Sequence, residues 1–465
     1  MAANTLDNNK MRTMPVGKLL FNMALPLALS MLVQALYNVV DSIYVSRISE
    51  SAVTALSLAF PIQHLIIGFA TGIGVGMNSL LSKSLGENNR QRVNQAAGNG
   101  IFLMGIAVVL FMLFGTFFAR PFFAIQSSVE ETVKGGGDYL TICCIFCVGL
   151  FVEVLGERML QASGRTIFTL FTQGTGAIVN IILDPVFIFG VPALGIPALG
   201  MAGAAIATVI GQWIAAILAI IFNLTKNPDV QFGLKFIRPD LKVLSKMLSV
   251  GIPSIIMMAI GSVMTFSMNG IFQGFKDYGE TATGVFGVYF KLQSFVIMPV
   301  LGINNASVSI IAYNYGAKLP GRITKNLKCA LVSALTFMFL GLTVFQLFPT
   351  VLLDLFEPTE EFLRLGISAL RIVSLSFPFA AVSIALSASF QAMGVGIYST
   401  ITSLCRQLVV LVPVAYLLSL TGNVHLVWWA FAIAEIVCMV LSILFYSRIY
   451  RNKIKPLYEE SKAVL

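Results

Sequence analysis

Long uninterrupted apolar runs are the feature of this sequence that most limits its fold. A helix needs roughly 20 apolar residues to cross about 30 Å of hydrocarbon, and runs of this length recur along the chain. Because a bilayer has no water to bond an open backbone, each run must form a helix or belong to a closed barrel. Barrel strands need only about 10 residues of alternating polarity, whereas these runs are longer and continuously apolar. The sequence therefore predicts an all-α, polytopic membrane protein.

Twelve transmembrane helices are predicted, in two sets of six. Their expected bounds are 19–45, 54–81, 96–119, 137–157, 166–190, 200–223, 246–273, 284–312, 327–349, 363–392, 397–420 and 426–449. Hydrophobic residues make up 57% of the chain and charged residues 11%, against about 25% charged residues in soluble domains. The formal net charge of +9 therefore does not indicate a nucleic-acid partner; the surrounding partner is membrane lipid.

Lys and Arg residues are distributed unevenly between the two sides of these spans. Most of them lie at the two chain ends and in the loops after spans two, four, six and eight. The opposite side keeps only Arg47, Arg120, Lys134, Lys276 and Arg364. Since basic residues stay in the cytoplasm, we expect a protein of the cell membrane with both termini cytoplasmic.

The two sets of six spans resemble each other in sequence. At an offset of 230 residues, Gly72 matches Gly302, and Gln161 matches Gln391. Such matches indicate a duplicated chain. Two six-helix lobes that start on the same side of the membrane are related by a pseudo-two-fold axis along the membrane normal. The expected parts are an N-lobe at 1–223, a cytoplasmic linker at 224–245, and a C-lobe at 246–465 that ends in a basic cytoplasmic tail.

Acidic residues at membrane depth are candidates for function, because a charge in hydrocarbon is costly. The deepest acids are Asp41, Glu153, Asp184 and Glu435. Asp41 belongs to a polar stripe at helical spacing. The other members proposed to line a substrate cavity are Gln34, Tyr37 and Asn38. The alternative is that this end of the span lies in the outer interface of the membrane.

Asp184 has Asn180 one turn before it. Pro185 has no N–H for the carbonyl of Ile181, so that oxygen is available. Together with Asp41, these groups are hard oxygen ligands suited to a small cation, and crowded buried carboxylates can hold a proton instead. The sequence leaves Na⁺ and H⁺ open, and a structural polar pair between two helices is the alternative.

The second half lacks these groups. In the first span the match is shifted by three residues, so that Pro26 matches Pro253 and Met268 replaces Asp41. At the offset of 230, Val410 and Val414 replace Asn180 and Asp184. This half is instead rich in methionine, an adaptable side chain that recurs at promiscuous binding surfaces. The cavity candidates of this half are Met257, Met264, Met268, Lys291, Asn304 and Asn305. Ordinary packing of the methionines is the alternative.

The first span contains a proline, Pro26, in its cytoplasmic half. Pro26 has no N–H for the carbonyl of Asn22, so bending costs little at this point. We expect Pro26 to act as a hinge. The sequence has no G-x-x-x-x-G-K-[ST] phosphate loop and no nucleophile or metal cluster typical of an enzyme. We expect a transporter without a cofactor, whose only metal would be the coupling Na⁺.

Five stretches resemble the multidrug and toxic compound extrusion (MATE) family of secondary transporters. They are LPLALSMLVQALYNVVDSIYVSR from Leu25, QASGRT from Gln161, NIILDPVFIFG from Asn180, GMAGAAIAT ending at Thr208, and AYNYGAK from Ala312. Their order and spacing carry the resemblance from Met14 to Tyr450. It implies two six-helix lobes around a central cavity, and export of small cationic or amphipathic compounds in exchange for Na⁺ or H⁺.

The resemblance also implies a cation site in the N-lobe. Its members are Asp41, Asn180, Asp184 and Thr208, and the resemblance alone points to Thr208. Some members of the family carry an acid in the seventh or tenth helix, and this chain has none in those interiors. We therefore expect ion coupling in the first half, in a protein that acts as a monomer.

A flippase for lipid-linked precursors is the main alternative, since the wider superfamily shares this architecture. A diphosphate headgroup would require a strongly basic cavity. The basic residues within the spans are Lys291, Arg371 and Arg406, and acids oppose them. A channel is less consistent with the sequence, because the acids lie in one half instead of forming a ring.

The charge pattern predicts the location of both chain ends. Single cysteines placed by Lys10→Cys and Lys462→Cys should resist a membrane-impermeant thiol reagent in intact cells and react once the membrane is opened. A cysteine placed at Lys134, on the predicted outer side, is the matched control and should react in intact cells. Labelling of either terminal cysteine in intact cells would show that the predicted orientation is wrong.

Overall fold

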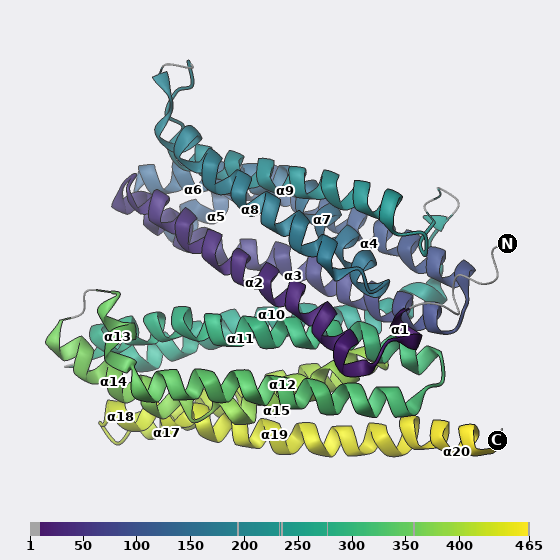
Figure 1. Cartoon of the computed structure of the whole chain (residues 1–465). Coiled ribbons are helices and arrows are strands. Elements are labelled where there is room, and N and C mark those ends of the chain that lie inside the picture. The colour runs from purple at the N-terminus through teal and green to yellow at the C-terminus, as the bar shows by residue number, and fades with distance from the viewer. Residues whose placement is uncertain are drawn as a thin grey trace. The chain divides into compact units, whose positions relative to one another are not determined.

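The computed structural model describes residues 10–192, 195–231, 233, 236–276, 278–356 and 359–463. These residues are helical almost throughout (Figure 1). The long helices are α2 (Val16–Ser46), α3 (Glu50–Gly86), α4 (Arg90–Phe117), α6 (Glu130–Ile145), α7 (Val148–Ala162), α8 (Thr166–Phe189), α9 (Gly200–Lys226), α10 (Leu241–Gln273), α11 (Gly279–Gly316), α12 (Pro320–Leu347), α14 (Glu360–Ser374), α15 (Phe377–Ala392) and α19 (Trp429–Ile449). The shorter elements are α1 (Lys10–Thr13), α5 (Ala119–Gln126), α13 (Pro349–Asp354), α16 (Gly396–Leu404), the π-helices η3 (Cys405–Leu411) and η4 (Tyr450–Ile454), α17 (Val412–Ser419), α18 (Val424–Val427) and α20 (Lys455–Ala463).

The number of possible membrane spans agrees with the sequence. In the described part of the chain, ten helical segments are long and apolar enough to cross a membrane, and two bent helix pairs raise the number to twelve. The expected all-α, polytopic fold is confirmed. Two spans differ from the expectation because they are bent by 46°, one between α6 and α7 and the other between α14 and α15.

The two bends have different local causes. Pro378, at the start of α15, has no N–H for the carbonyl of Ser374, so the helix cannot continue unbroken. At the other bend, the N–H of Gly149 bonds the carbonyl of Phe146, only three residues back, at 3.4 Å. This tighter bond interrupts the regular α-helical pattern.

Equivalent turns show the duplication in the backbone itself. Asn88 and Lys318, 230 residues apart, both have positive φ, at 58° and 55°. Gly164 and Gly394, at the same separation, have φ of 73° and 72°. Positive φ is uncommon for residues other than glycine, so its recurrence at a lysine indicates that the turn is inherited with the repeat.

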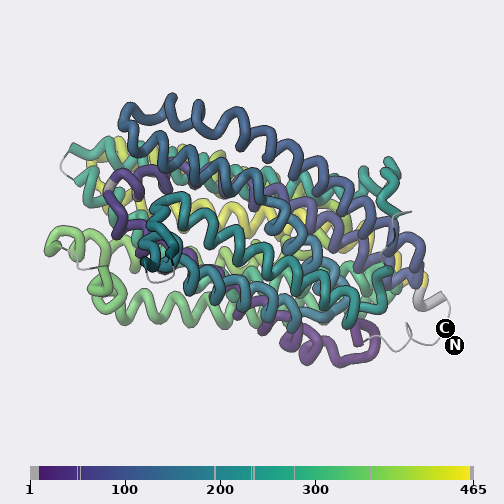
Figure 2. Tube along the Cα trace, turned by 90° about the horizontal axis from the view of Figure 1, so that it is seen from above, coloured from purple at the N-terminus to yellow at the C-terminus, as the bar shows by residue number. Residues whose placement is uncertain are grey.

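The chain packs as two compact units. Unit 1 contains the chain up to Ala28 together with the chain from Ile256 onward, and unit 2 runs from Leu29 to Ile255. Helices α2 and α10 therefore each pass from one unit to the other near their middle. In each unit the long helices run side by side, as Figure 2 shows from a second direction. The lobe bounds 1–223 and 246–465 stay a prediction, and residues 232, 234 and 235 of the expected linker lie outside the described part.

Both ends of the described chain lie at the same turn of unit 1. Arg322, at the start of α12, donates from Nη2 to the carbonyls of Met11 at 2.9 Å and Met14 at 2.8 Å. Lys318, in the preceding turn, donates from Nζ to Oε2 of Glu460 at 2.8 Å. An even number of spans is consistent with this arrangement, because it returns the chain to the side where it started.

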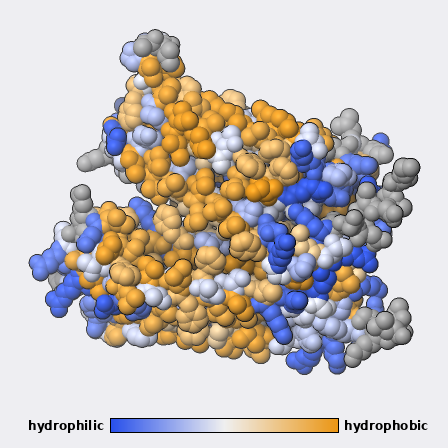
Figure 3. Space-filling model, in the orientation of Figure 1, coloured by the Kyte–Doolittle hydropathy of each residue, from blue (hydrophilic) through white to orange (hydrophobic). Residues whose placement is uncertain are grey.

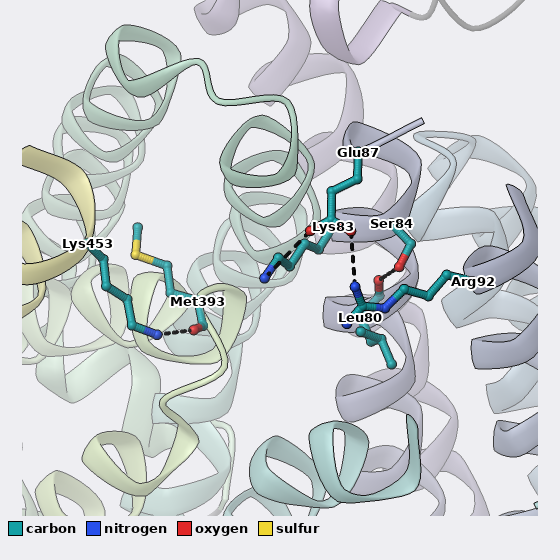
Figure 4. Close-up of polar contacts among 7 residues, drawn as sticks. All are labelled: Leu80, Lys83, Ser84, Glu87, Arg92, Met393 and Lys453. Carbon is teal, nitrogen blue, oxygen red and sulfur yellow. Dashed lines mark hydrogen bonds and ion pairs between the residues drawn. The ribbon is translucent and has the colours of Figure 1, made fainter. Parts of the chain in front are cut away.

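Polar residues gather toward the ends of the helices, and hydrophobic residues cover the middle of each unit (Figure 3). At one such end, Glu87 lies 3.7 Å from Nζ of Lys83 and 3.3 Å from Nη1 of Arg92 (Figure 4). In unit 1, Nζ of Lys453 donates to the carbonyl of Met393 at 2.7 Å. A cation there satisfies a carbonyl at the end of α15, where the helix has none of its own N–H groups left.

Candidate functional site

Helices α8 and α9 pack closely in unit 2 because glycines lie between them. A Cβ added at Gly211 would be 2.8 Å from the carbonyl oxygen of Gly176, and one added at Gly203 would be 2.3 Å from that of Phe187. Small residues allow such close approach of membrane helices. The approach brings polar side chains of α8 within hydrogen-bond distance of α9.

Three of the four expected cation-site residues meet at this contact. Nδ2 of Asn180 donates to Oδ1 of Asp184 at 3.2 Å and to Oγ1 of Thr208 at 3.3 Å. Asp184 is fully buried and Asn180 is 3% exposed. The amide of Asn180 therefore links α8 to α9 and fixes the position of the Asp184 carboxylate.

Asp41, on α2, belongs to the same unit as this cluster. Its carboxylate lies within electrostatic range of Asp184, and the hydroxyl of Tyr37 lies within range of both. Among the described residues, Oδ1 of Asp41, Oδ1 of Asn180 and Oδ2 of Asp184 are buried and have no hydrogen-bond partner. Two helices of unit 2 thus contribute three acceptors without a donor.

These oxygens can hold a cation. A buried acceptor without a partner costs about 1–3 kcal/mol, and more when it is charged. Carboxylate, amide and hydroxyl oxygens are ligands for hard cations, and a carboxylate can also accept a proton. In either case the ligand supplies the positive charge that the side chains lack. The residues present therefore fit Na⁺ or H⁺.

A neighbouring acid, Glu157 in α7, was not selected from the sequence. Its Oε1 accepts a bond from Oγ1 of Thr172 at 2.7 Å, and its Oε2 accepts one from Nε2 of Gln173 at 2.8 Å. Glu157 is 3% exposed, and both of its oxygens are bonded. It differs in this from Asp41 and Asp184, so it supports the packing of α7 on α8.

The equivalent region of the second half is apolar. Met268, which replaces Asp41 in the repeat, is fully buried in a hydrophobic cluster of unit 1. Val410 and Val414, which replace Asn180 and Asp184, pack against the same cluster. The two halves share a scaffold, but only the first builds a polar site at this place.

The methionine and asparagine candidates of the second half are mostly enclosed. Met264 packs beside Met268 in the same cluster, and Met257 is half-buried. Nδ2 of Asn304 bonds the carbonyl of Ile384 at 2.5 Å and Oγ of Ser387 at 2.8 Å. In this conformation Met264, Met268 and Asn304 thus serve packing, and their contact with a substrate stays a prediction.

The other cavity candidates have accessible surface. Lys291 and Asn38 are exposed, and Gln34, Tyr37 and Asn305 are half-buried. Gln34, Tyr37 and Asn38 lie on α2 beside Asp41, in agreement with the helical stripe. Their role in binding a substrate is likewise a prediction.

The second half has a half-buried ion pair. Nη1 of Arg406, in η3, lies 3.5 Å from Oε1 of Glu435 in α19. The pair neutralises two charges at membrane depth. The pair gives one oxygen of Glu435 a cationic partner, whereas Oε2 is buried without a hydrogen-bond partner among the described residues.

Comparisons with known proteins agree with this architecture. The family model described as MatE matches residues 26–186 and again residues 253–417, in agreement with the internal repeat. The multidrug export protein MepA of Staphylococcus haemolyticus (strain JCSC1435) is 25% identical over 428 residues, which cover 92% of each chain. A solved structure described as MATE in the straight conformation has a TM-score of 0.89 at 25% identity and covers 97% of this chain and 98% of its own. One described as MATE in the bent conformation has a TM-score of 0.86 at 25% identity, with 96% and 97% covered.

The geometry predicts that the hydroxyl of Thr208 is a ligand. A ligand at 100 times its Kd stabilises the native state by about 2.7 kcal/mol, so the coupling ion should raise the thermal unfolding midpoint in detergent. If the ion is Na⁺, Thr208→Val should need about tenfold more of it for the same shift, which corresponds to about 1.4 kcal/mol. Thr208→Ser, which keeps the hydroxyl, is the control. Equal shifts in all three proteins would contradict this role of Thr208.

Proposed function

The chain belongs to the MATE family of multidrug efflux transporters, and we propose that it is an antiporter that exports cationic or amphipathic compounds in exchange for Na⁺ or H⁺. The coupling ion binds at Asp41, Asn180, Asp184 and Thr208. The observation that carries this proposal is the group of three buried, unpartnered oxygens contributed by α2 and α8. A membrane helix retains such groups at a cost, and a bound cation removes that cost.

The class of substrate is inferred from the descriptions of the relatives and from the acidic residues of the first half. The relatives are described as multidrug export proteins, which does not favour a flippase for lipid-linked precursors. Gln34, Tyr37 and Asn38 share a face of α2 with Asp41. An organic cation on this face would be attracted by the carboxylates, and Tyr37 offers an aromatic surface for it.

Competition between ion and substrate gives the exchange. The occupied and the empty carboxylate site differ by a full charge, and electrostatic interactions are strong where water is excluded. A bound cation joins Asp41 of α2 to Asp184 of α8. We propose that this draws α2 toward α8, alters the face that carries Tyr37 and Asn38, and releases the substrate outward.

Pro26 allows this movement. It lies in α2 two residues before the point where the helix passes from unit 1 to unit 2. Because Pro26 cannot bond the carbonyl of Asn22, the helix can bend there without losing a regular hydrogen bond. Family structures described as straight and bent show that relatives adopt more than one conformation. The antiporter is proposed to act as a monomer in the cell membrane, with both termini in the cytoplasm.

Removing either carboxylate charge should uncouple transport. Asp41→Asn and Asp184→Asn should each abolish the efflux of a fluorescent cation from vesicles under an imposed Na⁺ gradient or, separately, an imposed pH gradient. Asp354→Asn, which changes an exposed carboxylate at the end of α13, is the matched control and should transport normally. A variant of Asp41 or Asp184 that transports like the wild type would remove that residue from the coupling site.

Substrate and coupling ion should weaken each other's binding. A ligand shifts a conformational equilibrium only through its different affinities for the two states, and the coupling between two ligands is reciprocal. Equilibrium binding of a fluorescent cation should therefore weaken as Na⁺ rises or as pH falls, according to which ion is coupled. Pro26→Ala should lower the transport rate more than the binding affinity. Affinity that is indifferent to both ions would contradict this mechanism.

A further inference from the structure

Helices α2 and α10 cross between the two units at equivalent positions. The change of unit falls between Ala28 and Leu29 in α2 and between Ile255 and Ile256 in α10. Each crossing follows a proline by two residues, Pro26 in one helix and Pro253 in the other. The family model also starts at these two prolines in its two matches. The crossings are therefore corresponding parts of the repeat.

Gly302 of α11 lies against the crossing point of α2. A Cβ added at Gly302 would be 2.6 Å from the backbone nitrogen of Ala28, 2.8 Å from its Cα and 3.1 Å from its Cβ. Two of these three atoms belong to the backbone, which cannot turn aside as a side chain can. The two helices thus approach each other as closely as a glycine allows.

Gly72 of α3 lies against the crossing point of α10 in the same way. A Cβ added there would be 2.4 Å from Cγ1 of Ile255 and 2.8 Å from the carbonyl oxygen of Gly251. Ile255 is the repeat equivalent of Ala28, and Gly72 is the equivalent of Gly302. The same contact between a glycine and a crossing helix therefore occurs twice, once in each unit.

We propose that Gly302 and Gly72 are the pivot contacts of the transport cycle, at which α2 and α10 turn against α11 and α3. This inference rests on the proposed transport function and extends it to residues distant from the ion site. Because glycine has no Cβ, two helix backbones that meet at a glycine can rotate or slide against each other without steric obstruction. The prolines allow bending within each crossing helix, and the glycines allow movement between helices.

The two pivot contacts differ in the number of glycines that form them. Gly76, one turn after Gly72, also contacts α10, because a Cβ added there would be 2.2 Å from the carbonyl oxygen of Met247. The equivalent residue in α11 is Ala306, which is buried. Two successive glycine contacts hold α10 on α3, whereas a single one holds α2 on α11. We therefore expect α2 to move more during the cycle, and α2 is also the helix that carries Asp41.

The test is a comparison of glycine-to-alanine substitutions. Gly302→Ala should retain equilibrium binding of a fluorescent cation and lose gradient-driven efflux. Gly287→Ala is the matched control in the same helix, because no described atom lies within 4 Å of a Cβ added there. It should bind and transport like the wild type. A purely structural role would lower binding and efflux together, through the amount of folded protein. Efflux by Gly302→Ala equal to that of the wild type, or an equal loss of binding and efflux in a variant that folds normally, would overturn the proposal.

A second variant covers the case in which Gly302→Ala does not fold. At Gly72 the nearest obstacle is the side chain of Ile255 rather than a backbone atom. Gly72→Ala should therefore lose efflux, and Gly72→Ala combined with Ile255→Ala should recover part of it. Efflux by Gly72→Ala equal to that of the wild type would contradict the contact on which the proposal depends.

A readout without transport separates this inference from the proposed function. Spin labels at Val39 of α2 and Phe295 of α11, both exposed, are introduced in a background in which the six cysteines are replaced. The distribution of distances between them should change when Na⁺ is added or the pH is lowered, and Gly302→Ala should suppress that change. If the wild type exports no tested compound, the proposed function fails while the distances still decide the pivot. An equal change in wild type and Gly302→Ala would overturn the pivot.

Discussion

The polar groups of this chain must find their partners inside the protein, because hydrocarbon offers none. Helices meet this requirement for the backbone, and most buried side chains meet it as well. Asn223 donates to the carbonyls of Gly156 and Ala219 at 2.9 and 2.8 Å. Among the buried polar atoms of the described residues that do not meet this requirement, Asp41, Asn180 and Asp184 contribute three oxygens, two of them from carboxylates. Their position in helices of one unit is best explained by a ligand that arrives from outside the chain.

Much of the fold could be predicted because membrane helices are recognisable in a sequence by their length and their low polarity. The expected span 166–190 corresponds to α8 at Thr166–Phe189, and the expected span 200–223 begins where α9 begins. The bend at Ser374 had a local signal in Pro378, but the bend between α6 and α7 lacks a proline. The π-helix η3 had no signal either, since no local pattern in its sequence distinguishes a π-helical turn from an α-helical one. The passage of α2 and α10 between two units depends on packing, which no local pattern records.

The site could be predicted only in part, for a related reason. Asp41 and Asp184 were found because charge at membrane depth is rare. Thr208 came from family resemblance alone, because threonine is common in helices and its contact with Asn180 depends on how α8 packs on α9. The pairing of Arg406 with Glu435 could not be predicted from the sequence either, since it joins two helices through tertiary structure. Sequence shows which side chains need a partner, whereas the fold decides which of them receive one.

Duplication followed by divergence gives the two halves unequal tasks. The place that holds Asp41, Asn180 and Asp184 in the first half is filled by Met268, Val410 and Val414 in the second, so the proposed ion site belongs to one half of the repeat. An ion can change the conformation of the whole chain only if its binding alters contacts outside that site. Helix α2 meets this condition, because Asp41 lies in its unit 2 part while the residues up to Ala28 belong to unit 1. A displacement of α2 at Asp41 therefore acts on a helix whose two parts belong to different units. Pro26 lies beside the residue at which α2 passes from one unit to the other.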